Sequence, residues 1–199
     1  MKYLLPIAYL PPIEYFAFLI QKQEIFIESQ EHFIKQSIRN RCFIYSTKGA
    51  HNLTIPKYRK SSSKTVISNI KISNINNWKR NHYESIRCSY NSSPFFEYYK
   101  DSFREFYESE ESNLFKFNLR LIYKILEILN IKKEINLTTY YEHEFEGNDL
   151  RNYKFYSNNL VTYTQVFEDR HGFIPNLSII DLLFNIGPET TEYLEKLSI

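Results

Sequence analysis

Glycine and the short motifs that mark common enzyme classes are scarce or missing in this sequence. Only four glycines occur among 199 residues, so there is no Gly-rich phosphate loop of the P-loop or Rossmann type. Serine-elbow (G-x-S-x-G), zinc-hydrolase (H-E-x-x-H) and C-x-x-C motifs are also absent. These absences argue against P-loop NTPases, Rossmann oxidoreductases and zinc hydrolases, but they leave other enzymes open.

Cysteine is scarce as well. Cys42 and Cys88 are the only two, they lie far apart, and we expect both in apolar surroundings. This pattern predicts two buried free thiols rather than a disulfide. Because no His or Cys stands at ligand spacing from either thiol, the sequence predicts no metal site, and it predicts no cofactor.

No apolar run approaches the roughly 20 residues that cross a bilayer. The apolar stretch at residues 3–10 is interrupted by Pro11 and Pro12 and then by Glu14, and no small-residue cleavage site follows it. We therefore interpret residues 3–10 as a buried first strand rather than a signal peptide. The sequence predicts a cytoplasmic protein without stable membrane insertion.

Net charge is also small. The 25 Lys and Arg residues nearly balance the 23 Asp and Glu residues, giving a net charge of +2. No global field attracts nucleic acid, so nucleic acid is not an expected partner and any anion site must be local. With 43% hydrophobic residues, 17 Tyr and 16 Phe, residues 1–199 are predicted to form one packed domain that can also line a polar cleft.

The first third of the chain is rich in short apolar runs. An apolar helix over residues 13–20, with Pro12 in its first turn, separates two of these runs and predicts a parallel strand–helix–strand unit. A turn at residues 47–50 predicts an antiparallel hairpin. The expected strands cover residues 4–10, 24–28, 42–45, 52–56 and 66–72.

Helical periodicity follows from Trp78 onward. Asn77 is expected to cap one helix, Ser93 and Pro94 to begin another, and Asn130 to close an amphipathic helix over residues 114–129. A polar loop or lid is expected at residues 142–159, followed by an apolar helix over 178–185 and a short final helix. The predicted fold is α/β: a mixed sheet built mainly from the N-terminal third, covered by helices from the C-terminal two thirds.

Basic residues form the first candidate site. Lys35, Arg39 and Arg41 alternate with other residues, so an extended backbone would place three cations on one face, where they can bind phosphate or carboxylate. The alternative is an exposed edge strand protected by charge. A second basic segment at residues 57–64 fits a solvated loop better than a phosphate clamp.

Trp78 and His82 form the second candidate site, because residues four apart share one helix face. His82 is a candidate general base, and Trp78 can stack on a sugar ring. The alternative is a partly buried histidine whose hydrogen bonds are satisfied within the fold.

The third candidate site lies in the apolar segment 176–185. Asn176 or Ser178 can cap the helix, and Asp181 and Asn185 then lie one turn apart among Ile, Leu and Phe. Buried polar side chains must be hydrogen-bonded. They either brace the loop at residues 168–173, where Arg170 and His171 are candidate partners, or point into a cleft.

Several of these segments together resemble the WbqC-like protein family. The likeness is carried by Arg39-Asn40-Arg41, by Trp78-x-x-x-His82 with Tyr90 and Pro94-Phe95-Phe96, by Tyr163-x-Gln165-x-Phe167, and by the 176–187 segment. The order along the chain is that of the family, and the likeness is greatest to its shorter branch. Longer members begin with a His-Gln-Pro segment, where this chain has Leu5-Pro6-Ile7.

The resemblance implies a role in surface-polysaccharide assembly, with acyl or aminoacyl (glycyl-type) transfer to a sugar-containing precursor such as a nucleotide-sugar. The alternative is a non-catalytic module that binds a glycan precursor or a protein. The catalytic candidates are His82 and Asp181. The substrate-binding candidates are Lys35, Arg39, Asn40, Arg41, Trp78, Tyr163, Gln165, Asn176 and Asn185, and we expect Arg39, Arg41, Trp78 and His82 to share one cleft.

Overall fold

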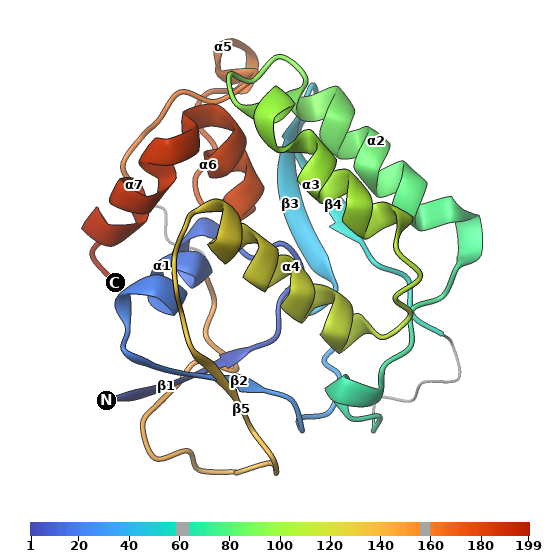
Figure 1. Cartoon of the computed structure of the whole chain (residues 1–199), viewed down its shortest axis with the longest axis vertical. Coiled ribbons are helices and arrows are strands. Elements are labelled where there is room, and N and C mark those ends of the chain that lie inside the picture. The colour runs from blue at the N-terminus through green and yellow to red at the C-terminus, as the bar shows by residue number, and fades with distance from the viewer. Residues whose placement is uncertain (59–63, 156–159) are drawn as a thin grey trace.

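The computed structural model describes residues 1–58, 64–155 and 160–199. It confirms the α/β class, with strands concentrated toward the N-terminus and helices toward the C-terminus (Figure 1). Most of the basic segment at residues 57–64 lies outside the described residues.

Four parallel strands form the main sheet, in the order β5-β2-β1-β6. β1 (Lys2–Pro6) and β2 (Glu24–Glu28) pair along their full lengths and are joined by helix α1 (Ile13–Gln21), as the sequence predicts. β5 (Ile135–Leu137) and β6 (Asn148–Asp149) flank them. These two strands are too short to leave a periodic signal, which is why the sequence reading places no strand there.

The hairpin of β3 (Arg41–Ser46) and β4 (Gly49–Thr54) confirms the predicted antiparallel pair. It forms a separate two-stranded sheet rather than extending the parallel one. Cys42 and Ile44 of β3 are buried, while Phe43 between them is half exposed. This alternation shows that one face of the hairpin packs inward, against helix α2.

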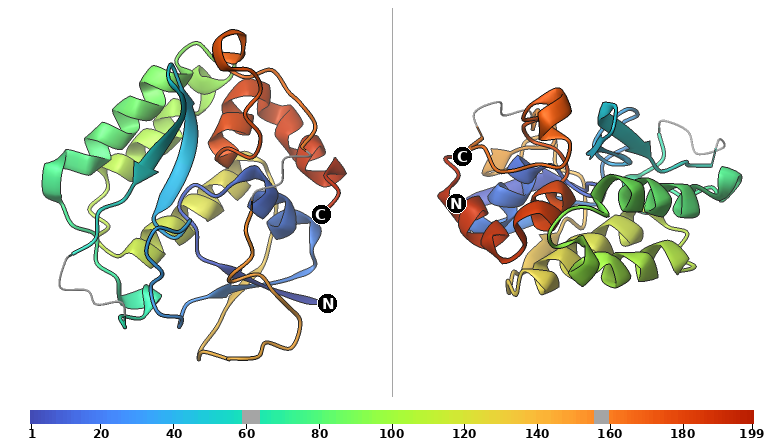
Figure 2. Two further views of the ribbon diagram at one scale, coloured as in Figure 1. Left: turned by 180° about the vertical axis from the view of Figure 1, so that it is seen from behind. Right: turned by 90° about the horizontal axis from the view of Figure 1, so that it is seen from above.

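Among the described residues, six α-helices follow the β3–β4 hairpin along the chain. Helices α2 (Trp78–Tyr90), α3 (Phe96–Glu108) and α4 (Leu114–Ile128) lie together on one side of the molecule, and the hairpin lies on the other side of α2 (Figure 2). Helix α6 (Ile179–Ile186) and helix α7 (Thr190–Lys196) pack against α1. The remaining helix, α5 (Glu168–His171), is a single turn.

Aromatic side chains join these layers. The ring of Phe184 in α6 lies 5.2 Å from the ring of Tyr90 in α2, and 5.2 and 5.3 Å from the rings of Phe96 and Phe103 in α3. Aromatic pairs at such separations are favourable beyond the area they bury. None of the helices traced in the described ranges has the length and apolarity needed to span a membrane.

Four local expectations are wrong. β1 ends at Pro6, and residues 7–10 belong to a buried loop instead. The strand expected at residues 66–72 is a short 3-10 helix, Ile67–Asn69. Helix α3 begins at Phe96, because Ser93 donates its hydroxyl to the carbonyl of Tyr90 and continues the preceding turn. Cys88 is exposed at the outer surface of α2, although both thiols are free as expected.

Candidate functional site

The loop that follows β1 is the starting point of the site. Its residues 7–11 are buried, and Leu10 has a positive φ of 39°, a conformation that costs energy for a residue with a side chain. The amide of Tyr9 donates to the carbonyl of Ile38 at 2.9 Å, which fixes the loop against the chain before β3. Strained loops at the carboxyl end of a parallel strand are common positions for functional side chains.

Tyr9 stands in the middle of a buried hydrogen-bond chain. Its hydroxyl lies 2.9 Å from Nδ1 of His82 in α2 and 2.6 Å from the hydroxyl of Tyr107 in α3. The backbone of Thr54 in β4 also hydrogen-bonds the His82 ring. These two hydrogen bonds link Tyr107, Tyr9 and His82 into one continuous chain.

The surroundings of His82 keep its imidazole neutral. Burial lowers the pKa of His82 to about 4, against a smaller raising effect of the Thr54 hydrogen bond. Burial likewise raises the pKa of Tyr9 and of Tyr107, so both hydroxyls stay protonated. His82 is buried and its Nδ1 is bonded to Tyr9, so the hydroxyls of Tyr9 and Tyr107 connect the imidazole to the surface of the helices.

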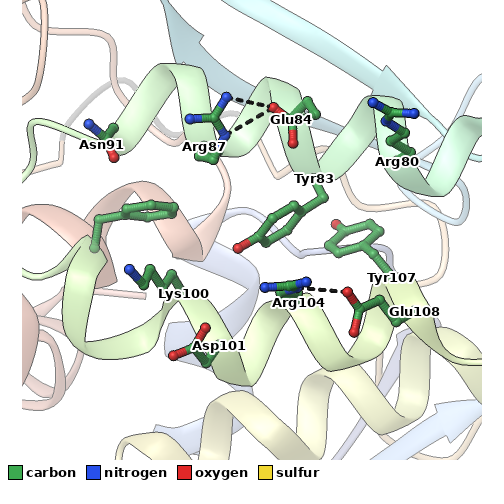
Figure 3. A pocket seen from close by; sticks show the side chains of 11 residues that line it. Arg80, Tyr83, Glu84, Arg87, Asn91, Lys100, Asp101, Arg104, Tyr107 and Glu108 are labelled. Atoms are coloured by element: carbon green, nitrogen blue, oxygen red, sulfur yellow. Dashed lines mark hydrogen bonds and ion pairs between the residues drawn. The ribbon is translucent and has the colours of Figure 1, made fainter.

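Tyr107 also lines a groove of about 770 Å³ between α2 and α3. Figure 3 shows Tyr83 of α2 and Tyr107 of α3 lying between the two helices, with charged side chains along both rims. Four cations contribute to these rims: Arg80, Arg87, Lys100 and Arg104. The groove is large enough for a ligand of the size of a sugar or nucleotide.

Carboxylates partly neutralise the rims. Arg87 is paired with Glu84, and Arg104 with Glu108, both at 2.7 Å. Such exposed pairs are weak, so an anionic ligand can replace the carboxylate at little cost. Arg80 has no ion-pair partner among the described residues and is available at one end of the groove.

The groove continues into a second depression of about 660 Å³, which shares Arg80 and Tyr107 with it. Trp78 lines this depression, and its ring meets that of His82 edge-on at 5.1 Å. The predicted Trp78–His82 pair therefore forms. The indole Nε1 is buried and has no hydrogen-bond partner within the described part of the chain.

Asp181 lies elsewhere, fully buried in α6. One of its oxygens accepts from the hydroxyl of Tyr90 at 2.7 Å, and the other accepts from Tyr163 at 2.6 Å and Gln165 at 2.8 Å. Burial raises the pKa of Asp181, while these three donors act in the opposite direction. Both oxygens are occupied, so Asp181 positions other side chains.

Asp181 thus holds the segment before α5 in place, and it does so through its hydrogen bonds to Tyr163 and Gln165. The partners suggested by the sequence, Arg170 and His171, do not take that place: the His171 ring lies 2.9 Å from the carbonyl of Thr47 instead. Asn185 donates to the backbone carbonyl of Asp181 at 2.7 Å, within the same helix.

The basic row expected at residues 35–41 does not form as an extended strand. Residues 35–40 are turns, and only Arg41 enters β3. Lys35 is exposed, whereas Arg39 is 3% exposed and makes two hydrogen bonds of 2.6 Å to Glu31. The turns break the alternation on which the prediction depended.

Arg39 and Trp78, which were expected to share one cleft, therefore line two separate depressions. Arg39 lines a crevice at the end of β1, while Trp78 lines the depression beside α2. The Nε of Arg41 is buried without a partner among the residues described. The side chain of Asn40 donates to the carbonyl of Ile55 at 2.9 Å, an interaction internal to the fold.

Asn176 has a structural role at the start of α1. Its side-chain oxygen accepts from the amide of Glu14 at 2.9 Å, and its nitrogen donates to the carbonyl of Phe155 at 2.8 Å. An asparagine from a distant segment thus satisfies a free amide in the first turn of α1. Ser178 is the capping residue of α6, as the sequence allows.

Sequence analysis missed Tyr9, Tyr107 and the cations of the groove. A usable signal exists for the cations, because Arg80, Glu84 and Arg87 share one face of α2, and Lys100 and Arg104 one face of α3. Two charged faces on consecutive helices can meet in a groove. Across the described ranges, no group of three or more His, Cys, Asp or Glu is placed to hold a metal ion.

The chain is similar in sequence to known proteins. It is 24% identical, over an alignment of 217 positions, to "Uncharacterized protein Rv1507c" of Mycobacterium tuberculosis, and the alignment covers 94% of each chain. No solved structure gives a significant match. Residues 7–152 and 137–193 match the profile of the WbqC-like protein family. Together these two ranges span most of the sequence. This chain therefore belongs to the WbqC-like protein family.

Proposed function

We propose that this protein transfers an acyl or aminoacyl group to a sugar-containing precursor during assembly of a surface polysaccharide. The observation that carries the proposal is the hydrogen-bond chain from Tyr107 through Tyr9 to His82, which begins at the wall of a groove lined by cations. Membership of the WbqC-like family supplies the substrate class, through the association of that family with surface-polysaccharide genes.

The groove supplies the binding part of the proposal. Activated acyl donors and nucleotide-sugars carry negative charge, and guanidinium groups bind such oxyanions through paired hydrogen bonds. Arg80, Arg87 and Arg104 offer three guanidinium groups along about 770 Å³. Tyr83, half-buried between the helices, offers an apolar ring face with a polar tip to a sugar or base (Figure 3).

The hydrogen-bonded residues Tyr107, Tyr9 and His82 supply the proton transfer that the reaction needs. The acceptor hydroxyl or amine attacks the acyl carbon, a new ester or amide bond forms, and the bond to the leaving group breaks. The acceptor proton moves to the oxygen of Tyr107 as Tyr107 passes its own proton to Tyr9, and Tyr9 passes its proton to Nδ1 of His82. The reverse shift returns a proton to the leaving group.

The environment of His82 suits this transient role. With a pKa of about 4, the imidazole is unprotonated at neutral pH and free to accept, but it does not hold the proton. Asp181 acts at a distance, by holding Tyr90 at 2.7 Å and thereby the carboxyl end of α2.

The test uses purified protein, a panel of nucleotide-sugars, and isotope-labelled acyl and aminoacyl donors, with products detected by mass spectrometry. We expect a sugar product that has gained the labelled group. His82→Ala is expected to slow turnover by about 100-fold or more, the usual contribution of a general base. Tyr9→Phe is expected to lower kcat and leave KM unchanged, since it interrupts the chain without touching the groove.

Groove variants separate binding from chemistry. The double substitution Arg87→Ala/Arg104→Ala is expected to raise the KM for the anionic donor by about tenfold or more. Its matched control is Lys116→Ala/Lys132→Ala, which removes the same charge from exposed positions outside the groove. Equal effects of the two double variants would reject the groove as the donor site.

The alternative is a binding module without turnover, which the aromatic groove also suits. It predicts that the same nucleotide-sugars bind, that no labelled product forms from any donor, and that His82→Ala binds as well as the parent. That combination of results would reject the transferase.

A further inference from the structure

A second concave site lies at the carboxyl end of the parallel sheet, away from the α2–α3 groove. It is a crevice of about 220 Å³ lined by Pro6, the last residue of β1, and by residues that follow β6. β1 continues through α1 to β2 on one side, and β6 lies on its other side. Crevices outside the carboxyl ends of parallel strands, where connections diverge, are the usual ligand sites of open α/β sheets.

Arg39 contributes a buried guanidinium to this crevice. Its Nε and Nη2 donate to Glu31, each at 2.6 Å, and Nη2 also donates to the carbonyl of Arg151 at 3.2 Å. These bonds leave Nη1 as the one nitrogen of this guanidinium without a partner among the described residues. Arg39 is only 3% exposed and is one of the residues that line the crevice.

The other side chains around the crevice favour an anion. Its lining contains the cations Arg39, Arg151 and Lys154 and no carboxylate, unlike the α2–α3 groove, where cations and carboxylates alternate. Arg151 is already saturated, because it donates to Asp149, Glu28 and two backbone carbonyls. Lys154 is exposed and has no ion-pair partner within the described ranges.

We propose that this crevice binds a small oxyanion, the carboxylate or phosphate group of a ligand, through Nη1 of Arg39 and the ammonium of Lys154. Buried, pre-positioned guanidinium donors bind such groups better than exposed ones, because the side chain is already ordered by its bonds to Glu31. The volume of about 220 Å³ restricts the enclosed part of the ligand to a small group. The site is distinct from the groove and does not depend on the transferase activity.

The experiment is a calorimetric titration with inorganic phosphate, and separately with acetate, at constant ionic strength. It is carried out in the Arg87→Ala/Arg104→Ala background, so that the groove does not contribute. We expect saturable binding of at least one anion. Preference for phosphate identifies a phosphoryl ligand, and preference for acetate identifies a carboxylate ligand.

Two charge-matched variants decide the location. Lys154→Glu is expected to weaken anion binding by about tenfold or more, because it replaces a direct partner with a repelling charge. Lys116→Glu makes the same charge change at an exposed position outside the crevice and is expected to bind as the parent does. A crystal soaked in the preferred anion should show it within hydrogen-bond distance of Nη1 of Arg39.

Three results would overturn the proposal: no saturable binding of either anion, equal weakening by the two lysine substitutions, or bound anion only at other positions. Both substitutions are at exposed side chains, so loss of folding does not confound the comparison.

Discussion

His82 shows how one buried residue can be both structural and reactive. Its ring is 7% exposed and is held by the hydroxyl of Tyr9 and the backbone of Thr54. These contacts join α2 to the loop after β1 and to β4, so the imidazole links three segments. The alternative interpretation of His82, a histidine satisfied within the fold, therefore describes its contacts correctly. The relay through Tyr9 and Tyr107 is what connects it to the groove.

A pH dependence of stability follows from the same contacts. The pKa of His82 is about 4 in the folded protein and about 6.5 in an unfolded chain. The folded state therefore binds fewer protons at this site than the unfolded state between these values. The contribution to stability is complete above about pH 6.5 and is lost as the pH falls toward 4, with a total of about 3 kcal/mol.

Urea unfolding of the parent and of His82→Gln, measured every half unit from pH 7.5 to 4.5, tests this expectation. Both proteins share all carboxyl titrations, so the difference between them isolates His82. We expect the stability of the parent to fall more steeply than that of His82→Gln below pH 6.5. Parallel curves would show that His82 is not held neutral by burial.

The end of helix α6 shows how an element is terminated by packing as well as by sequence. Gly187 has a φ of +53°, and a Cβ placed there would overlap the ring of Phe95. The backbone of Phe95 is held in place, because its amide donates to the carbonyl of Phe184 at 3.0 Å. Glycine is required here for two separate reasons, conformation and space.

Gly187→Ala and Gly49→Ala separate these two reasons. Gly49, in the β3–β4 hairpin, also has a positive φ of 89°, but a Cβ there would meet nothing within 4 Å. We expect Gly49→Ala to cost about 1 kcal/mol from strain alone. Gly187→Ala should cost about 1–3 kcal/mol more, from the clash with Phe95.

Thermal or urea unfolding of the two variants measures the difference directly. Near-equal losses of stability would mean that Phe95 moves aside freely, and that only the backbone conformation requires glycine at position 187.

At the scale of the whole molecule, a single hydrophobic core connects the elements. Buried side chains of β1, the hairpin, α2–α4, α6 and α7 belong to one continuous cluster. Two residues carry much of this continuity: Phe184 joins α6 to α2 and α3, and Phe117 of α4 packs against Tyr9, Trp78 and Tyr107. This arrangement supports the expectation that residues 1–199 form one domain, which remains a prediction.

One cooperative unfolding transition is the expected outcome for a single domain. Trp78 is the only tryptophan, so its fluorescence reports on the α2 side of the core, while far-UV circular dichroism reports on all helices and strands. The urea midpoints from the two signals should coincide. A separate fluorescence midpoint would indicate that the α2–α3 side unfolds independently of the parallel sheet.

The sequence by itself determined the features that depend on neighbouring residues. Apolar spacing located α4 at Leu114–Ile128 and α6 at Ile179–Ile186, and the apolar run after Pro12 located α1. The turn at residues 47–50 located the hairpin. Helices, turns and their caps are local structures, so a sequence window of ten to fifteen residues contains most of the information that specifies them.

Only the tertiary structure decided which polar side chains meet. Tyr9 is 73 residues from His82 and 98 residues from Tyr107, and the partner of Arg39 proved to be Glu31 across a series of turns. β5 and β6 exist because β2 and β1 offer them backbone partners, not because their two or three residues favour a strand. Hydrogen bonds and ion pairs between distant segments form only after the apolar core has fixed the separation of those segments. No local pattern in the sequence specifies that separation, which is why the helices could be predicted and the relay beneath the groove could not.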